Sequence, residues 1–287
     1  MSSRVAVVKI TGDIRNSVEE AIRLIGGLKI SPGEMVLVKP NVCYTKNTHN
    51  MILTDFRVIK AVVEMIKEYT NRILVVETDN ISGSAEKRAL ESGLLELLKE
   101  LDVEFMNLSG DEVEIHEVAG FRLEIPKTVL EADRIVNLPK MKTSGPTLVT
   151  LSLKNLFGLL ANRDKKMMHK ALDEILPYLG KVIRQDMIVV DGIVAMEGNG
   201  PLVGNPVQMN LVVAGVDPVA VDSTCARIMG FNPREVRHVV KAAELGVGSM
   251  DAEVVGTPVE EVAKKFLRPY SVKAVFRTFR ILPKIYL

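Results

Sequence analysis

The sequence predicts an α/β protein with a mainly parallel, twisted sheet flanked by helices. Short β-branched runs alternate along the chain with longer segments of helical period, which is the pattern of βαβ units. The 287 residues can bury a large core, and 47% hydrophobic with 25% charged residues is typical of a soluble globular protein. Because no repeat or Pro/Ser-rich linker interrupts the pattern, we expect a single α/β domain over residues 1–258 and a basic amphipathic tail over residues 259–287.

Short apolar runs rich in Val and Ile are the predicted strands of this sheet. They are Val5–Ile10, Met35–Val38, Arg72–Glu77, Val103–Asn107, Arg134–Asn137, Met187–Asp191 and Gln208–Ala214. Residues 111–125 differ, because Val113 and Ile115 alternate with polar residues and Gly120 then turns the chain into a second alternating run. This segment predicts a β-hairpin inserted on the sheet or at its edge.

Segments with apolar residues at helical spacing lie between the strands and predict the covering helices. They are Val18–Leu28, Thr54–Tyr69, Ala85–Leu98, Thr128–Ala132, Leu148–Leu160, Lys165–Leu179, Pro218–Met229 and Arg234–Leu245. Asp217 stands directly before Pro218, where a carboxylate caps a helix whose first position tolerates proline. Capping is therefore the predicted role of Asp217.

Charge and cysteine content argue against several classes of protein. A formal charge of +1 gives no overall electrostatic basis for binding nucleic acid. The two cysteines, Cys43 and Cys225, are too few for a disulfide scaffold and fit a reducing compartment. The chain begins with too short an apolar stretch for a secretory signal and contains no apolar run of about 18 residues, so it predicts a cytoplasmic protein with no transmembrane segment.

Three segments place a lysine and an asparagine beside Pro or Gly at the edge of an apolar run, namely residues 38–41, 137–142 and 153–158. An ammonium beside an amide suits an anionic oxygen, because lysine supplies charge and donors while asparagine both donates and accepts. Ligands of parallel sheets gather beyond the carboxyl ends of strands, where several of these residues are expected. The pattern predicts a pocket for a small carboxylate or phosphate lined by Lys39, Asn41, Asn137, Lys140 and Asn155.

Lys154 lies inside an otherwise apolar segment, so its ammonium must reach solvent, find a partner or meet a ligand. A desolvated lysine has a lowered pKa and can act as a base or nucleophile. We therefore predict that Lys142 or Lys154 provides acid/base chemistry, with Glu197 or Asp222 as the counter-charge. Asp222 could equally favour the dipole of its own helix.

Glycines are dense between Asp191 and Pro201, and backbone without side chains lets N–H groups approach a ligand closely. Gly198, Asn199 and Gly200 are therefore candidate ligand-binding residues, although a hairpin or Ω-loop explains the same composition. The segment has neither the Walker ending nor the Rossmann glycine pattern.

The sequence names no cofactor and predicts no metal centre, because no two of the four histidines have metal-site spacing. Magnesium held by Asp79, Asp191 or Glu197 against a phosphate is a weaker alternative. His169 follows two lysines and two methionines, so it is either a surface residue or part of a mobile loop over the anion site.

Together the motifs resemble those of the domain-of-unknown-function three-six-two (DUF362) family. They are Leu37–Asn41, Asn137–Thr143, Leu153–Gly158, Asp191–Ile193 with Met196–Pro201, and Asp217–Asp222, within a resemblance that spans residues 5–250. The resemblance implies that the chain works with a redox partner, because many relatives carry a ferredoxin-like segment with cysteine-ligated iron–sulfur clusters. This chain has only two cysteines and cannot hold a four-cysteine cluster alone. Relatives often have a histidine shortly after the lysine of the middle motif, where this chain has Thr143 and Ser144.

Two functions follow as alternatives. The first is an enzyme that binds a small anionic molecule and uses lysine acid/base chemistry. The second is a cofactor-binding or accessory protein that works with a separate, ferredoxin-like iron–sulfur partner. A further possibility is electron transfer by a cluster that two subunits share through Cys43. The tail from Lys264 holds seven basic residues and no acidic one, so it either contacts an anionic membrane surface or folds back on its own domain or on a second subunit of a homo-oligomer.

Overall fold

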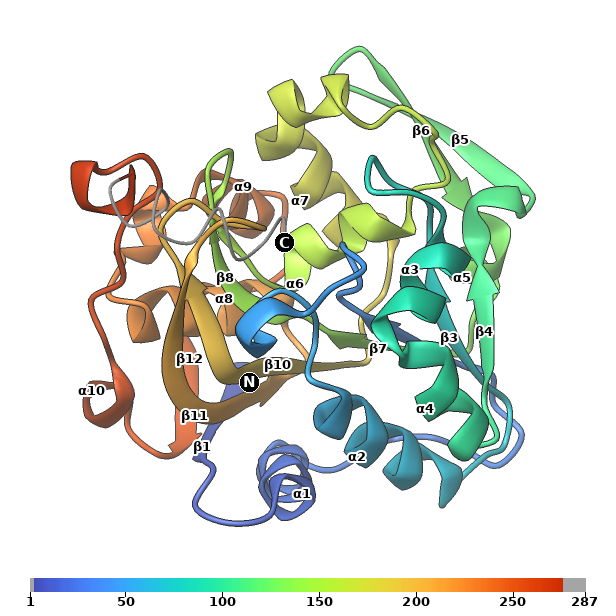
Figure 1. Cartoon of the computed structure of the whole chain (residues 1–287), viewed down its shortest axis with the longest axis horizontal. Coiled ribbons are helices and arrows are strands. Elements are labelled where there is room, and N and C mark those ends of the chain that lie inside the picture. Colours follow the sequence, from blue (N-terminus) through green and yellow to red (C-terminus); the bar gives the residue numbers. More distant parts are fainter. Residues whose placement is uncertain (1–2, 276–287) are drawn as a thin grey trace.

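The computed structural model of the chain describes residues 3–275 and confirms the predicted fold class, with a mostly parallel central sheet flanked by helices (Figure 1). Within these residues the sheet has ten strands, eight of them in the order β12-β1-β11-β10-β7-β2-β3-β4, while β8 pairs with β10 and β9 with β8. The strands of this sheet are β1 (Ser3–Lys9), β2 (Val36–Pro40), β3 (Ile73–Glu77), β4 (Glu104–Asn107), β7 (Arg134–Leu138), β8 (Lys140–Ser144), β9 (Leu148–Thr150), β10 (Met187–Glu197), β11 (Asn205–Gly215) and β12 (Ala252–Gly256).

Helices cover both faces of the sheet. The α-helices are α1 (Ile14–Leu24), α2 (Phe56–Lys67), α3 (Ala85–Ser92), α4 (Leu94–Glu100), α5 (Lys127–Glu131), α6 (Ser152–Asn155), α7 (Leu172–Val182), α8 (Pro218–Ile228), α9 (Arg237–Glu244) and α10 (Val259–Val262). Short 3₁₀ turns are η1 (Thr48–Asn50), η2 (Leu108–Gly110), η3 (Leu156–Leu159), η4 (Met167–Ala171) and η5 (Pro233–Glu235).

The alternation of side chains along β1 shows how the two faces are filled. Ala6 and Val8 belong to a core shared with α1 and α2, whereas Val5 and Val7 pack with α8 and α9 on the opposite face. A third apolar cluster lies under α7 and η3 beside the β-hairpin. Since successive side chains of a strand point to opposite faces, a sheet buried on both sides needs the continuous apolar runs seen in the sequence.

The predicted hairpin forms, as β5 (Val113–Val118) and β6 (Phe121–Pro126), but it is a separate two-stranded sheet that does not pair with the main one. The predicted helix over Leu148–Leu160 is wrong in its first part. Leu148–Thr150 pairs antiparallel with β8 as β9, and only then does the chain turn into α6 and η3. Gly93, with a φ of 85°, divides the predicted helix over Ala85–Leu98 into α3 and α4.

The sequence predicts Asp191 at the end of a strand, but Asp191 lies inside β10. Strand β10 continues to Glu197 because it pairs with β11 along most of its length, from Ile188 opposite Gly215 to Glu197 opposite Asn205. Asp191 therefore lies inside the sheet, directly opposite Lys140 of β8. More than half of the glycine-rich segment from Asp191 to Pro201 is therefore strand and not loop.

The rest of that segment packs against residues near the C-terminus. The backbone N–H of Gly198 donates to the Leu267 carbonyl at 3.0 Å, and the N–H of Leu267 donates to Glu197 Oε2 at 2.8 Å. The N–H of Tyr270 donates to Asn199 Oδ1 at 2.7 Å. The part of the predicted tail up to residue 275 thus contacts its own domain, while residues 276–287 of that tail lie outside the described residues.

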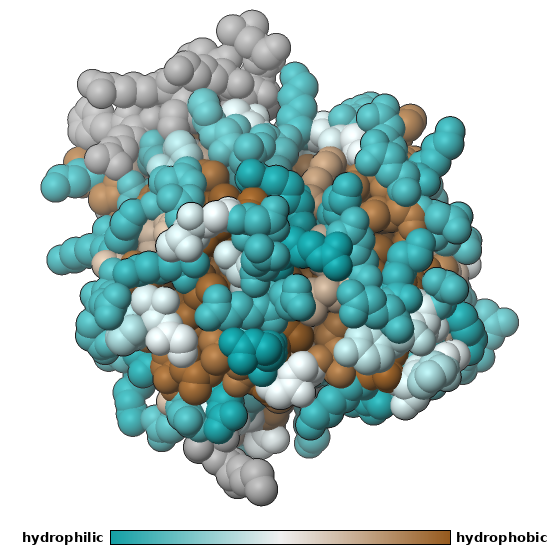
Figure 2. All heavy atoms as spheres, turned by 90° about the horizontal axis from the view of Figure 1, so that it is seen from below, coloured by the Kyte–Doolittle hydropathy of each residue, from teal (hydrophilic) through white to brown (hydrophobic). Residues whose placement is uncertain are grey.

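The surface seen from below is covered mostly by hydrophilic side chains, with hydrophobic ones in small areas between them (Figure 2). Within residues 3–275, no helix is both long and apolar enough to cross a membrane.

Candidate functional site

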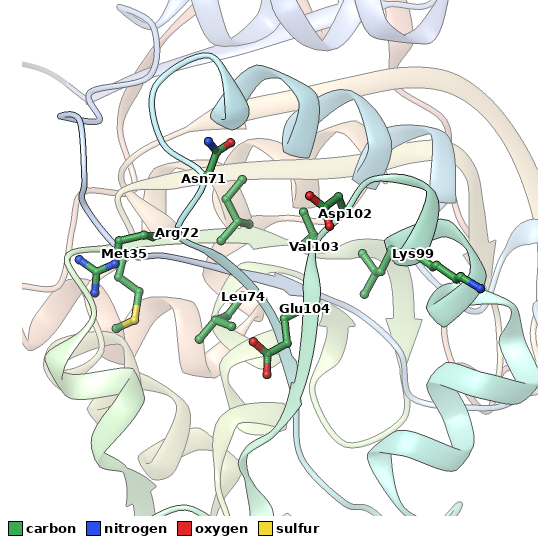
Figure 3. Close-up of a pocket in the computed structure, with 10 residues that line it drawn as sticks. Met35, Asn71, Arg72, Leu74, Lys99, Asp102, Val103 and Glu104 are labelled. Carbon is green, nitrogen blue, oxygen red and sulfur yellow. The ribbon is translucent and has the colours of Figure 1, made fainter.

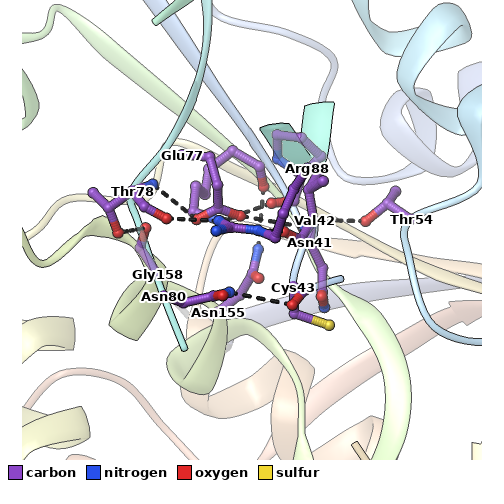
Figure 4. Close-up of polar contacts among 12 residues, drawn as sticks. Asn41, Val42, Cys43, Thr54, Glu77, Thr78, Asn80, Arg88, Asn155 and Gly158 are labelled. Atoms are coloured by element: carbon purple, nitrogen blue, oxygen red, sulfur yellow. Dashed lines mark hydrogen bonds and ion pairs between the residues drawn. The ribbon is translucent and has the colours of Figure 1, made fainter. Parts of the chain in front are cut away.

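A buried ion pair lies where β2 and β3 end. Lys39 Nζ is 3.0 Å from Glu77 Oε2 and donates to the Pro40 carbonyl at 2.7 Å. Glu77 also accepts from the Val42 N–H, and Arg88 donates to the carbonyls of Val42 and Thr78 (Figure 4). Burial lowers the pKa of Lys39, while the charge of Glu77 acts in the opposite direction.

Gly158 of η3 packs directly against this ion pair. A Cβ at this position would lie 2.9 Å from Glu77 Oε1 and 3.0 Å from Lys39 Nζ, which is too close for either group to stay in place. The Lys-Asn-Leu-Phe-Gly motif therefore ends in glycine because the ion pair occupies the space of a side chain.

Gly158→Ala should displace the Lys39–Glu77 pair and lower the free energy of unfolding by about 1–3 kcal/mol, the usual cost of overpacking. Chemical denaturation measures this loss. Gly12→Ala is the matched control, because nothing lies within 4 Å of its Cβ position. Equal stability of the two variants would contradict the packing argument.

A second buried ion pair joins β8 to β10. Lys140 Nζ is 2.7 Å from Asp191 Oδ2, and both side chains are 0% exposed. Asp191 also accepts from the backbone N–H groups of Asp55 and Ile193, at 2.7 and 2.9 Å. Asp191 thus fixes β8, β10 and the start of α2 at one point.

Lys142, two residues further along β8, points to the same side as Lys140 but meets no carboxylate. Its Nζ donates to the Ile52 carbonyl at 2.8 Å and lies 3.4 Å from Asn41 Oδ1 and 3.6 Å from Cys43 Sγ. Burial lowers the pKa of Lys142. Asn41 and Cys43 are half-buried, so this ammonium lies just beneath the surface.

Lys154 of α6, like Lys142, forms no ion pair with a carboxylate among residues 3–275. Its Nζ lies 4.4 Å from the centroid of the Phe157 ring, a cation–π contact. Burial, together with the positive charge of Lys142, lowers the pKa of Lys154 to about 8. Two cations with no carboxylate between them therefore lie close enough to repel each other.

Asparagines join these elements. Asn155 Nδ2 donates to the Lys39 carbonyl at 3.1 Å and to Asn137 Oδ1 at 2.7 Å. Asn137 in turn donates to the Ser152 carbonyl and to Gln185 Oε1. Their amides hold α6 against the ends of β2 and β7.

Asp222 lies beneath α6 rather than in the lysine cluster. Its carboxylate accepts from the N–H and Oγ of Ser152 and from the N–H of Leu153, at 2.7 to 3.1 Å. Burial raises the pKa of Asp222 to about 7. Asp222 therefore positions the start of the helix that carries Lys154.

The structure brings together only part of the predicted site. One cluster lies where β2 and β7 end and β8 begins, and it contains Lys39, Asn41, Asn137, Lys140, Lys142, Lys154 and Asn155. Gly198 and Gly200 instead contact Thr143 and Gly145, because the Gly198 carbonyl accepts from Thr143 Oγ1 and the Gly200 carbonyl accepts from the Gly145 N–H. Glu197 and Asn199 accept from the backbone N–H groups of Leu267 and Tyr270, near the C-terminus.

Arg88 and Lys165 were not predicted as site residues, and His169 was predicted as a surface residue or as part of a mobile loop over the anion site. Arg88 is fully buried beneath the Lys39–Glu77 pair. Lys165 Nζ donates to Thr78 Oγ1 at 2.6 Å and to the Asp79 carbonyl at 2.9 Å, and burial lowers its pKa to about 8. The His169 ring packs edge to face against the Phe157 ring. None of the three lies at the edge of an apolar run that ends a predicted strand, which is the pattern that predicts the other site residues.

A hollow of about 590 Å³ lies away from this cluster. It is lined by residues that precede β2, β3 and β4, among them Met35, Arg72 and Val103, so it lies at the amino ends of the strands (Figure 3). The lysine cluster lies at the opposite, carboxyl ends. Among residues 3–275, no group of three or more His, Cys, Asp or Glu side chains is placed to hold a metal ion.

The fold and the cluster define an α/β protein with lysines gathered at the carboxyl ends of mostly parallel strands, where such sheets bind ligands. The chain belongs to the DUF362 family: the model of this family, described as a domain of unknown function, matches residues 36–227. The resemblance predicted from the motifs is confirmed.

Relatives extend this likeness. A thylakoid-associated protein of Synechocystis sp. is 28% identical over 252 residues, which cover 85% of this chain and 78% of that protein. The lactate racemase apoprotein from Thermoanaerobacterium thermosaccharolyticum superposes with a TM-score of 0.51 at 14% identity, covering 79% of this chain and 57% of that one. A Thermotoga maritima protein gives a TM-score of 0.40 at 11% identity over 82% of this chain and 59% of its own. The chain thus spans under two thirds of either solved structure, and the first of them shows the fold alone.

Proposed function

We propose that the protein is an enzyme that binds a small carboxylate or phosphate at the lysine cluster and uses Lys154 in acid/base chemistry. The observation that carries the proposal is the contrast among the cations. Lys39 and Lys140 each meet a buried carboxylate, whereas Lys142 and Lys154 meet none among residues 3–275.

An anion bound between Lys142 and Lys154 would offset the free-energy cost of their desolvation and reduce their mutual repulsion. Leaving an ammonium buried without a counter-charge is costly, and a bound carboxylate or phosphate supplies that charge. The Lys39–Glu77 and Lys140–Asp191 pairs hold the surrounding backbone in place. Ammonium groups fixed before the substrate arrives also stabilise negative charge that develops during a reaction.

Acid/base chemistry is assigned to Lys154 because its pKa is lowered to about 8. A group whose pKa lies near the operating pH can both hold and release a proton. At pH 7 Lys154 is mostly the ammonium form, which binds the anion and can donate a proton.

A thermal-shift screen against carboxylated and phosphorylated metabolites tests the proposal. A ligand at 100 times its dissociation constant stabilises the folded protein by about 2.7 kcal/mol, which is readily measured. The shift should disappear in Lys142→Met and persist in Lys99→Met, a control at an exposed lysine of α4. A shift of equal size in both variants would place the ligand elsewhere.

An accessory role with a separate iron–sulfur partner is the second candidate, and the thylakoid association of the Synechocystis relative favours it. Such a protein would work at a membrane surface rather than free in the cytoplasm. Co-purification of an iron-containing partner, or visible absorption of the anaerobic protein, would support this function. Colourless protein that binds a metabolite through Lys142 would favour the enzyme.

A further inference from the structure

We propose that His169 belongs to the anion site and accepts a proton from the bound substrate through Nε2. This inference rests on the proposed function and names a second group for its acid/base step. The His169 and Phe157 rings meet edge to face, with centroids 5.3 Å apart and planes at 78°. The same Phe157 ring carries Lys154 Nζ at 4.4 Å. One aromatic ring thus has an ammonium and an imidazole as neighbours.

The hydrogen bond of His169 fixes which nitrogen is available. Nδ1 lies 3.0 Å from the Lys165 backbone carbonyl, and a carbonyl oxygen can only accept. Nδ1 therefore carries the hydrogen, and the neutral ring has its lone pair on Nε2. His169 lies at the surface, so Nε2 is reachable by a small molecule.

Lys165 holds this segment over the site. Its buried ammonium donates to Thr78 Oγ1 and to the Asp79 carbonyl, both directly after β3. His169 therefore stands on a backbone tied to the same edge of the sheet as Lys39 and Glu77.

The charges around His169 favour its neutral form. Partial desolvation lowers the pKa of His169, and the positive charge of Lys154 on α6 lowers it further. Hydrogen bonds to backbone groups of Lys165 and Lys166, on its own segment, act in the opposite direction. The Phe157 side chain, which packs against the imidazole from η3, carries no charge.

The step is a proton transfer. Nε2 takes the proton of a hydroxyl or an acidic C–H group of the bound anion and becomes an imidazolium. The electron pair of the broken bond stays on the substrate, where the Lys154 ammonium stabilises the negative charge. In the reverse direction the imidazolium returns the proton.

Imidazole nitrogen–proton NMR tests this assignment, because the chain has only four histidines. His169→Asn identifies the signal and keeps an amide where Nδ1–H donates, and His116→Asn on the distant hairpin is the control. We expect the Nδ1–H tautomer at pH 7. Lys154→Met should raise the pKa of His169 and leave that of His116 unchanged, and saturating sulfate should also raise the pKa of His169 in the wild type.

The outcomes separate the inference from the proposed function. A hydrogen on Nε2, or a His169 signal that responds neither to Lys154→Met nor to bound sulfate, overturns the role of His169 even if sulfate binds through Lys142. Sulfate binding that survives Lys142→Met overturns the proposed site instead. For a substrate found in the metabolite screen, His169→Asn should lower kcat by about 100-fold or more with little change in binding.

Discussion

Asp191→Asn should lower the free energy of unfolding by about 3–5 kcal/mol, because it leaves the Lys140 ammonium buried without its counter-charge. The side chains of this pair are 0% exposed and lie 2.7 Å apart. The carboxylate now accepts hydrogen bonds from the N–H groups of Asp55 and Ile193, and an amide in its place would turn an N–H donor toward one of them.

Chemical denaturation at constant pH measures this effect. The matched control is Glu253→Gln, which breaks the Arg4–Glu253 pair, whose side chains are 51% and 50% exposed. Pairs so exposed contribute about 0–1 kcal/mol. The double variant Lys140→Met, Asp191→Leu should recover much of the lost stability, since replacing both charges removes the unpaired one. A loss in Asp191→Asn no larger than in Glu253→Gln would show that the pair is not buried in solution.

The fold could be predicted from sequence because local patterns determine it. Continuous Val/Ile runs mark strands buried on two faces, and the hairpin shows a period of two. Strands β8, β9 and β12 were not predicted from the sequence. Strand β8 was missed because it holds Lys140, Lys142, Thr143 and Ser144, which are polar yet almost completely buried. Such a strand is stabilised by its pairing with β10 and β9 and by the carboxylate of Asp191.

The candidate site was predictable where strand ends mark it. Lys39, Asn137 and Lys140 come together because β2 and β7 end, and β8 begins, at one edge that parallel pairing fixes. Which lysine finds a carboxylate depends on distant residues such as Glu77 and Asp191, so sequence could not separate Lys39 and Lys140 from Lys142 and Lys154. The glycine-rich segment predicts a ligand-binding loop, but glycine is needed wherever two backbones pack closely, with or without a ligand.

Lys154→Met should lower turnover of a substrate found in the metabolite screen by about 100- to 1000-fold, the usual loss when one charge-stabilising donor is removed. It should also abolish a pH dependence that the wild type shows. Because the pKa of Lys154 is lowered to about 8, its ammonium is lost as the pH rises through 8. If binding requires that charge, affinity for sulfate should fall about tenfold per pH unit above this value.

Stability should move in the opposite direction over the same window. A lysine whose folded pKa is depressed binds its proton more tightly in the unfolded chain, so its contribution to the free energy of unfolding rises between about pH 8 and 10. Lys165 has the same lowered pKa of about 8 but donates to Thr78 and Asp79. Lys165→Met should therefore change how the free energy of unfolding depends on pH, while its affinity for sulfate still falls above pH 8. Lys154→Met should remove this fall in affinity. Calorimetric titrations of both variants with sulfate at pH 7 and 9 measure this difference. If the affinity stopped falling with pH in Lys165→Met alone, the binding charge would belong to Lys165.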